Sequence, residues 1–222
     1  MRRLAAIDQG TVGPAPRELP FGLDAGVYLQ AEAALLTGLP RTTVRRWLHL
    51  ERGVEAIPVL AGQPLVSFHD LISLRAVAAL RAAGMKLQKI KQGVGLMRRD
   101  LGLQHPLATE DFKTSGVDRY FPSASEQMAA QELVAAYLQD VKYGLLTDQH
   151  RLAVSWDPPG VSIDPLIQRG APCIAGTRVQ VAVLKRYLDA GDSAEYLAAL
   201  FELEADDIRR AVAWYIGPKL AA

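Results

Sequence analysis

The chain has 222 residues and a formal net charge of +1 at neutral pH, and half of its residues are apolar. This length and composition allow a sizeable core and exclude a disordered chain. No apolar run approaches the ~18 residues that a membrane span needs, and the first residues, MRRLAAIDQG, lack the apolar segment and cleavage site of a signal peptide. A single cysteine cannot form an internal disulfide, so the composition predicts a protein of the reducing cytoplasm.

The charges are unevenly distributed along the chain. Residues 1–105 carry 14 Lys and Arg against 8 Asp and Glu, whereas residues 106–222 carry 11 against 16. Within residues 41–99 there are 11 basic and 3 acidic side chains. This imbalance is typical of a module that binds a polyanion, although a solvated basic surface without a partner would give the same count.

The first strong pattern is YLQAEAALLTGLPRTTVRRW, which follows an irregular N-terminal arm of residues 1–26. Leu29, Ala33 and Leu36 recur at helical spacing until Gly38, and a second helix after Pro40 places Val44 and Trp47 on one apolar stripe. Two short helices joined through a glycine turn predict a helix-turn-helix. We interpret Trp47 as a packing residue.

The second of these helices presents the candidate DNA contacts. With its apolar stripe turned inward, its polar residues fall on the other faces, where a major-groove helix needs phosphate clamps and base-edge donors. Arginine reads guanine through two hydrogen bonds, and threonine can contact a thymine methyl group. The candidates are Arg41, Thr42, Thr43, Arg45, Arg46 and Arg52.

The next residues predict a wing and a second pair of helices. Short β-rich runs at residues 56–60 and 65–68 flank a turn at 61–64 and predict a hairpin. Ser67 is the expected N-cap of a helix that ends at Gly84, with Asp70 in its first turn. A further amphipathic helix over residues 87–102 contains Gly93 and Gly95, which indicate close helix packing.

Residues 106–159 predict a connector that carries a small sheet. We expect a loop and short strand at 111–121, a helix at 125–138 with Met128 on its apolar face, and strands at 141–143 and 152–156. The N-cap candidate of that helix is Ser125. No chemical motif appears in this stretch.

The last segment, residues 160–222, predicts short strands followed by a trihelical module. GAPCIAGTRVQVAVL leads from a strand at 173–175, through a turn capped by Thr177, into a helix at 181–190. Helices at 193–201 and 205–216 follow, and Tyr187, Tyr196 and Leu200 are among the expected core positions. Acidic residues at the start of the third helix would repel phosphate, so the module predicts a protein contact or a dimer.

The sequence contains no motif for zinc binding, for a reactive cysteine or for a known type of catalysis. The four histidines, His49, His69, His105 and His150, have no zinc-ligand spacing, and we expect them at the surface or as caps. Cys173 lies in an apolar strand and is expected to be a buried, inert thiol. We therefore expect no enzymatic activity, metal or cofactor, although scattered carboxylates such as Asp157 and Asp164 leave an enzyme as a minor alternative.

Two resemblances follow from these patterns. The register of YLQAEAALLTGLPRTTVRRW and of LRAVAALRAAGMKLQKI resembles the MerR-like winged helix DNA-binding domain. Two departures are Leu29, where that family usually carries a Ser or Thr cap, and His105-Pro106, which ends the pattern before any long coiled-coil helix. A dimer would then be built elsewhere in the chain.

Residues 161–215 resemble the C-terminal domain of VapB-type antitoxins through the motif G-x-P-x-I-x-G-T-R, from Gly170 to Arg178. This resemblance implies a PIN-type ribonuclease toxin as partner and repression of the shared operon, and it makes operator DNA the polyanion. An arginine inserted among the carboxylates that hold Mg²⁺ in such a nuclease could block it. The candidates for toxin binding or dimer formation are Arg178, Lys185, Arg186, Arg209 and Arg210, and for Arg178 a structural role in the turn competes.

The sequence thus predicts a mainly α fold with small β elements (α+β). Its parts are an arm (1–26), a MerR-like winged helix domain (27–105), a connector (106–159) and an antitoxin-type domain (160–222). The leading functional hypothesis is a cytoplasmic, homodimeric antitoxin that represses its operon. Two alternatives remain: a stand-alone MerR-like regulator that responds to a small molecule or protein signal, and a purely structural interaction protein.

Overall fold

The computed structural model describes residues 23, 27–52, 59–60, 63–121, 127–145 and 150–217. In the described residues, the mainly helical α+β class that the sequence predicts is confirmed. The helices are α1 (Gln30–Thr37), α2 (Arg41–Arg52), α3 (Phe68–Ala82), α4 (Leu87–Leu101), α5 (Val117–Tyr120), α6 (Gln127–Tyr137), α7 (Val181–Asp189), α8 (Ala194–Phe201) and α9 (Ala205–Ile216). Three antiparallel pairs are formed by β1 (Val59–Leu60) with β2 (Gln63–Pro64), β3 (Val141–Leu145) with β4 (Arg151–Trp156), and β5 (Val161–Ser162) with β6 (Cys173–Ile174). Short helical turns are η1 (Pro106–Ala108), η2 (Phe112–Gly116) and η3 (Gln168–Gly170).

Helices α1 and α2 form the predicted helix-turn-helix. Leu29, which has no polar side chain, is the N-cap of α1, so this helix depends on packing for its start. Gly38 ends α1 with φ of 71°, a left-handed conformation that glycine adopts without a steric cost. On α2, Val44 and Trp47 are buried, which confirms the interpretation of Trp47 as a packing residue.

The wing hairpin differs from the prediction in its second strand. β1 pairs with Gln63–Pro64, not with residues 65–68. Val66 instead bridges Tyr28 in an antiparallel pair, and Phe68 already belongs to α3. The prediction was wrong because an apolar run before a helix cap has the same alternation as a strand. The predicted strand residues 56–58 lie outside the described residues, as does the arm except for Leu23.

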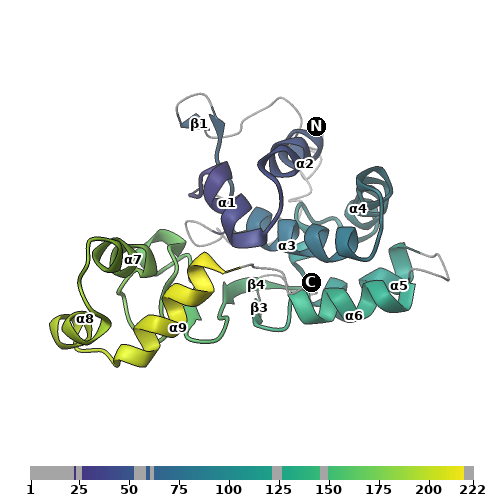
Figure 1. The fold of residues 1–222 in the computed structure, drawn as a ribbon. Coiled ribbons are helices and arrows are strands. Elements are labelled where there is room, and N and C mark those ends of the chain that lie inside the picture. Colours follow the sequence, from purple (N-terminus) through teal and green to yellow (C-terminus); the bar gives the residue numbers. More distant parts are fainter. Residues whose placement is uncertain are drawn as a thin grey trace, which may run out of the picture.

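Helix α3 lies at the centre of the molecule, between α1, α2 and α4 on one side and the β3–β4 hairpin with α6 on the other (Figure 1). Every residue from Phe68 to Leu80 is buried. Ser67 and Asp70 form a complete capping box at its start, as predicted: each side chain bonds the backbone N–H of the other residue. Because α3 is covered on all sides, its polar side chains need partners inside the protein.

Helix α4 packs through one of its two glycines. A Cβ at Gly93 would lie 2.2 Å from a ring carbon of Phe121, so close packing is confirmed there. At Gly95 an added Cβ would meet no described atom within 4 Å, so the same prediction was wrong for Gly95. Ile90, Val94 and Met97 supply the buried face, as the amphipathic pattern predicts.

The connector contains more helix than the sequence predicts. Residues 112–120 form η2 and α5 rather than a loop and strand, because Phe112 and Phe121 pack edge to face in the core, with ring centroids 6.5 Å apart. Met128 is 77% exposed on α6, so its placement on an apolar face was wrong. The predicted strands are confirmed as the β3–β4 hairpin, whereas Ser125 lies outside the described residues.

The C-terminal segment follows the predicted order of strands, turn and three helices. The Thr177 hydroxyl donates to the Ile174 carbonyl (2.9 Å) and accepts from the Val179 N–H (3.1 Å), which confirms it as a turn cap. Ser193 caps α8 by accepting from the Tyr196 N–H. The apolar set was only partly right, because three expected core side chains are exposed: Tyr187, Tyr196 and Leu200.

One buried hydrogen bond joins this segment to the N-terminal half. The Tyr28 hydroxyl donates to the Gly170 carbonyl oxygen over 3.1 Å, across 142 positions in sequence. Gly170 has φ of +79°, and a Cβ on it would lie 2.1 Å from the Tyr28 hydroxyl oxygen. The first glycine of the motif is therefore required by both its backbone conformation and its neighbour.

We expect Gly170→Ala to lower the free energy of unfolding by about 3 kcal/mol, since a left-handed backbone and an overpacked contact both carry a cost. Urea denaturation measures this loss. Gly191→Ala is the matched control, because Gly191 also has positive φ (+103°) but no described atom lies within 4 Å of the added Cβ. It should cost only about 1–2 kcal/mol.

A Tyr28→Phe background separates the two causes, because it removes the oxygen with which the new methyl group collides. Gly170→Ala should cost less in that background than in the wild type. An equal cost in both backgrounds, no larger than that of Gly191→Ala, would contradict the close contact.

Candidate nucleic-acid interface

The exposed face of α2 carries most of the predicted DNA contacts. Arg41, Thr42, Arg45 and Arg46 are exposed, and Thr43 is half-buried. The opposite face holds buried Val44, Trp47 and Leu48, so the helix is fixed to the protein through its apolar side. Arg52 lies in the last turn of α2, and its side chain is outside the described part. The arrangement leaves a row of guanidinium groups in solvent.

A cleft of about 380 Å³ lies beside this row, between α2 and the turn that joins α3 to α4. Thr42, Thr43 and Arg46 line it from α2, while Arg81, Lys86 and Gln88 line it from the other side. The described residues that line the cleft include three cations and no acidic side chain. Such a cleft attracts phosphate oxygens.

Arg81 and Lys86 were not among the candidates chosen from the sequence. Arg81 donates to the Met85 carbonyl oxygen over 2.7 Å, which holds its guanidinium at the turn. Lys86 is the N-cap residue of α4 and is exposed. The sequence shows that both residues flank Gly84, the turn glycine. It does not show that they lie opposite α2, because that position depends on the packing of α3.

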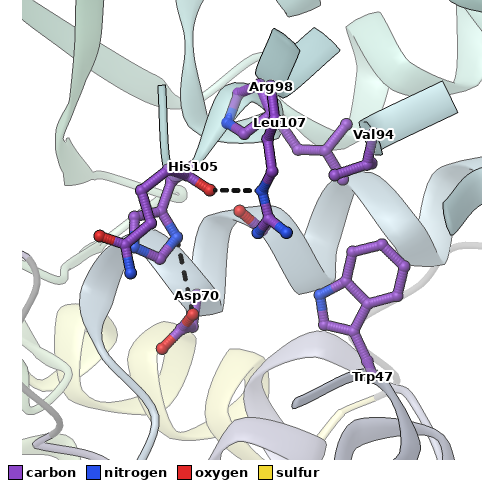
Figure 2. Close-up of a pocket in the computed structure, with 9 residues that line it drawn as sticks. Trp47, Asp70, Val94, Arg98, His105 and Leu107 are labelled. Atoms are coloured by element: carbon purple, nitrogen blue, oxygen red, sulfur yellow. Dashed lines mark hydrogen bonds and ion pairs between the residues drawn. The ribbon is translucent and has the colours of Figure 1, made fainter. Parts of the chain in front are cut away.

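Behind α2, a small enclosed space of about 10 Å³ borders Trp47, Asp70 and His105 (Figure 2). It has room for about one water molecule. The His105 Nδ1 lies 3.6 Å from Asp70 Oδ1, and Arg98 Nε donates to the Gln104 carbonyl oxygen over 3.0 Å. This space lies behind α2 and is too small for an organic ligand.

The histidines are placed differently from the prediction in two cases. His69 is fully buried and its Nε2 lies 3.0 Å from the Ala153 carbonyl oxygen, while His105 is 8% exposed. The surface prediction was wrong for both: His69 lies in the first turn of α3, which neighbouring elements cover, and His105 precedes η1 and lies beside Asp70 of that turn. His49 is exposed, and His150 is half-buried and pairs with Asp111 (2.7 Å).

The C-terminal cations fall into two groups. Lys185 pairs with Asp189, Arg209 with Glu195 and Asp206, and Arg210 with Asp207. Arg178 and Arg186 are exposed, and in the described part of the chain neither has an ion pair. The Arg178 carbonyl accepts from Gln168, so its backbone rather than its guanidinium contributes to the turn.

The exposed apolar side chains of α7 and α8 lie on the same module. Tyr187 is 43%, Tyr196 56% and Leu200 52% exposed, and Tyr196 and Leu200 are one helical turn apart. Large apolar side chains that gather on a surface are typical of protein contacts.

The described residues contain no group of three or more His, Cys, Asp or Glu side chains that could hold a metal ion. Cys173 is buried, as expected, and burial raises the pKa of its thiol. Across the described residues, every helix is too short or too polar to pass through a lipid bilayer.

Comparisons with known proteins place the C-terminal segment in context. Residues 161–215 match the family described as "Protein of unknown function (DUF433)". The chain is 25% identical to the protein named "Putative antitoxin VapB45" of Mycobacterium tuberculosis, over 88% of this chain and 96% of that relative. It is 26% identical to "Uncharacterized protein Rv2308" of the same organism, over 86% of this chain and 90% of the relative.

The fold also resembles a solved structure. The X-ray crystal structure of Rv2018 from Mycobacterium tuberculosis has a TM-score of 0.66 and 24% sequence identity, with 86% of this chain and 99% of that chain covered. This similarity supports the mainly helical α+β fold over most of the chain.

Proposed function

We propose that this protein is the antitoxin of a type II toxin–antitoxin system. It binds operator DNA to repress its own operon and neutralises a PIN-type ribonuclease by direct binding, as a cytoplasmic homodimer without catalytic activity, metal or cofactor. One observation supports the DNA-binding part of this proposal: the exposed arginines of α2 lie beside a cleft that has no acidic side chain among its described lining residues. The similarity to the protein named "Putative antitoxin VapB45" supports the antitoxin half.

DNA binding uses α2 in the major groove. Arg41, Thr42 and Arg45 are exposed in the first half of the helix, where a recognition helix contacts base edges. Arg46, Arg81 and Lys86 line the cleft and would hold a phosphate strand beside it. Thr43 and Arg52 complete the predicted set. Base contacts would then come from the exposed face of α2, and contacts with the DNA phosphates from the cleft beside it.

Toxin binding uses the C-terminal module. Three of its candidate cations are neutralised within the module, so among the candidates Arg178 and Arg186 are the guanidinium groups available to an acidic partner. The exposed side chains of Tyr187, Tyr196 and Leu200 supply the apolar area that a stable contact needs. The same side chains could also form a homodimer contact. Whether a toxin or a second copy of this chain covers them distinguishes the two uses.

We expect the double variant Arg45→Ala, Arg46→Ala to bind DNA from upstream of its own gene at least about 10-fold more weakly, since each contact of this kind contributes about 1–3 kcal/mol. The slope of log affinity against log salt should also become shallower by about 1–2, because fewer counterions are released. Fluorescence anisotropy over a salt series measures both.

Arg119→Ala is the control, because Arg119 is exposed on α5 and lies over the Tyr120 ring, outside the cleft. It should leave affinity and salt slope unchanged. Unchanged affinity of the Arg45→Ala, Arg46→Ala protein, with its fold verified by circular dichroism, would overturn the recognition-helix assignment.

The antitoxin half is tested by coexpression with the product of the neighbouring gene. The double variant Arg178→Ala, Arg186→Ala should release ribonuclease activity and fail to copurify the nuclease, because it removes the two candidate cations that have no ion pair among the described residues. The matched variant Arg209→Ala, Arg210→Ala should still inhibit, since those arginines already have carboxylate partners.

Retained inhibition by the first variant, or loss of inhibition only in the second, would contradict this contact. A solitary gene whose product represses transcription without any nuclease would favour the stand-alone regulator.

A further inference from the structure

A pocket of about 280 Å³ lies where α3, α6, β4 and α9 meet. Figure 1 shows the end of α9 reaching the β3–β4 hairpin close to α6. The walls include the indoles of Trp156 and Trp214 and the rings of Pro158 and Pro159, and its polar lining includes Arg75 and Asp140. The pocket therefore combines flat apolar surfaces with a buried cation, and it is separate from the DNA cleft.

Arg75 is only 7% exposed, and its guanidinium carbon lies 3.8 Å from the centroid of the Trp156 ring. Its Nε and Nη2 both donate to the Tyr137 carbonyl oxygen, at 3.1 Å for Nε. Its Nη1 is buried and has no hydrogen-bond partner among the described residues. Burial lowers the pKa of Arg75 to about 10, so the group still carries its charge at neutral pH.

Among the residues that the structure describes, no ion pair neutralises this charge. No carboxylate of the described residues lies within ion-pair distance of Arg75, although Asp140 acts on it at longer range. A buried cation with an unused donor is costly, and an anion placed against it would recover part of that cost.

Trp156 supplies a second unused donor at the same pocket. Its indole Nε1 is buried and also has no hydrogen-bond partner in the described part of the chain. Two N–H donors on adjacent side chains suit the two oxygens of a carboxylate. The apolar walls suit a flat ring attached to it.

We propose that this pocket binds a small aromatic carboxylate. The carboxylate accepts from Arg75 Nη1 and Trp156 Nε1, and the ring lies against Trp214 and the prolines. Because both donors are buried, the half-buried Trp214, which packs edge-on against Trp156 with centroids 5.6 Å apart, tilts to admit the ligand. The site goes beyond the proposed function and involves no residue assigned to DNA or toxin binding. It connects α3 of the N-terminal half with α9 of the C-terminal module.

The test is a titration of the full chain with benzoate, followed by the indole N–H resonances of its three tryptophans. We expect saturable shifts for Trp156 and Trp214, with a dissociation constant on the order of 1 mM or lower for so small a probe. Trp47 borders a different space and should not shift. Benzamide, the uncharged analogue, should bind at least about 10-fold more weakly, because it loses the charge-assisted hydrogen bonds.

Variants are placed at the rim, since Arg75 also supports the fold. Ala136→Phe fills the pocket from the exposed side of α6 and should abolish the shifts, whereas Ala129→Phe, exposed two turns earlier on the same helix, should leave them unchanged. Asp140→Asn removes a negative charge beside the site and should tighten benzoate binding several-fold. Absence of saturable shifts with benzoate, equal binding of benzamide, or unchanged binding in Ala136→Phe would overturn the proposal.

Discussion

The burial of Arg75 is the interaction on which the arrangement of the two halves depends. From α3 its guanidinium binds the last carbonyl of α6 and stacks on Trp156 of β4, and Trp156 in turn packs edge-on against Trp214 of α9. A carbonyl at the C-terminal end of a helix has no partner within its own helix and carries partial negative charge, so a cation is a suitable partner for it. Arg75 thus joins the central helix to α6 and to the β3–β4 hairpin, and Trp156 of that hairpin makes the contact with the C-terminal module.

This constraint explains how a short helix can hold rigidly the face that we propose to bind DNA. α2 is fixed through Val44 and Trp47 to a core built around α3, and α3 is in turn held by the Ser67–Asp70 capping box and by Arg75. The turn after α3 then places Arg81 and Lys86 opposite α2.

The second connection between the halves, from Tyr28 to Gly170, accounts for the first glycine of the sequence motif. The motif is thus largely architectural, and Arg178 is its one charged side chain, exposed and without an ion pair among the described residues.

The sequence predicted those features that depend on neighbours a few positions away. The capping box at Ser67, the inward stripe of α2, the Thr177 cap and the Ser193 cap all follow from local hydrogen bonding and helical periodicity. Residues 112–120 were missed because Gly116 and several β-branched and aromatic residues lower the local helix propensity, while the packing of Phe112 and Phe121 in the core overrides it.

Features that depend on distant contacts could not be predicted. Nothing local distinguishes a buried Arg75 from a solvated one, because its partners Tyr137 and Trp156 are 62 and 81 positions away. The exposed Tyr187, Tyr196 and Leu200 have the same spacing as core residues, so periodicity alone placed them inside. Arg81 and Lys86 line the cleft beside α2 only because α3 brings their turn opposite that helix.

Differential scanning calorimetry of Arg75→Met tests whether Arg75 couples the two halves, since methionine keeps much of the side-chain volume but removes the charge and its hydrogen bonds. We predict that the wild-type chain unfolds in one cooperative transition. In the variant, the module of α7–α9 should unfold in a transition of its own, separate from that of the N-terminal half. A single transition in the variant, merely shifted in temperature, would contradict the account.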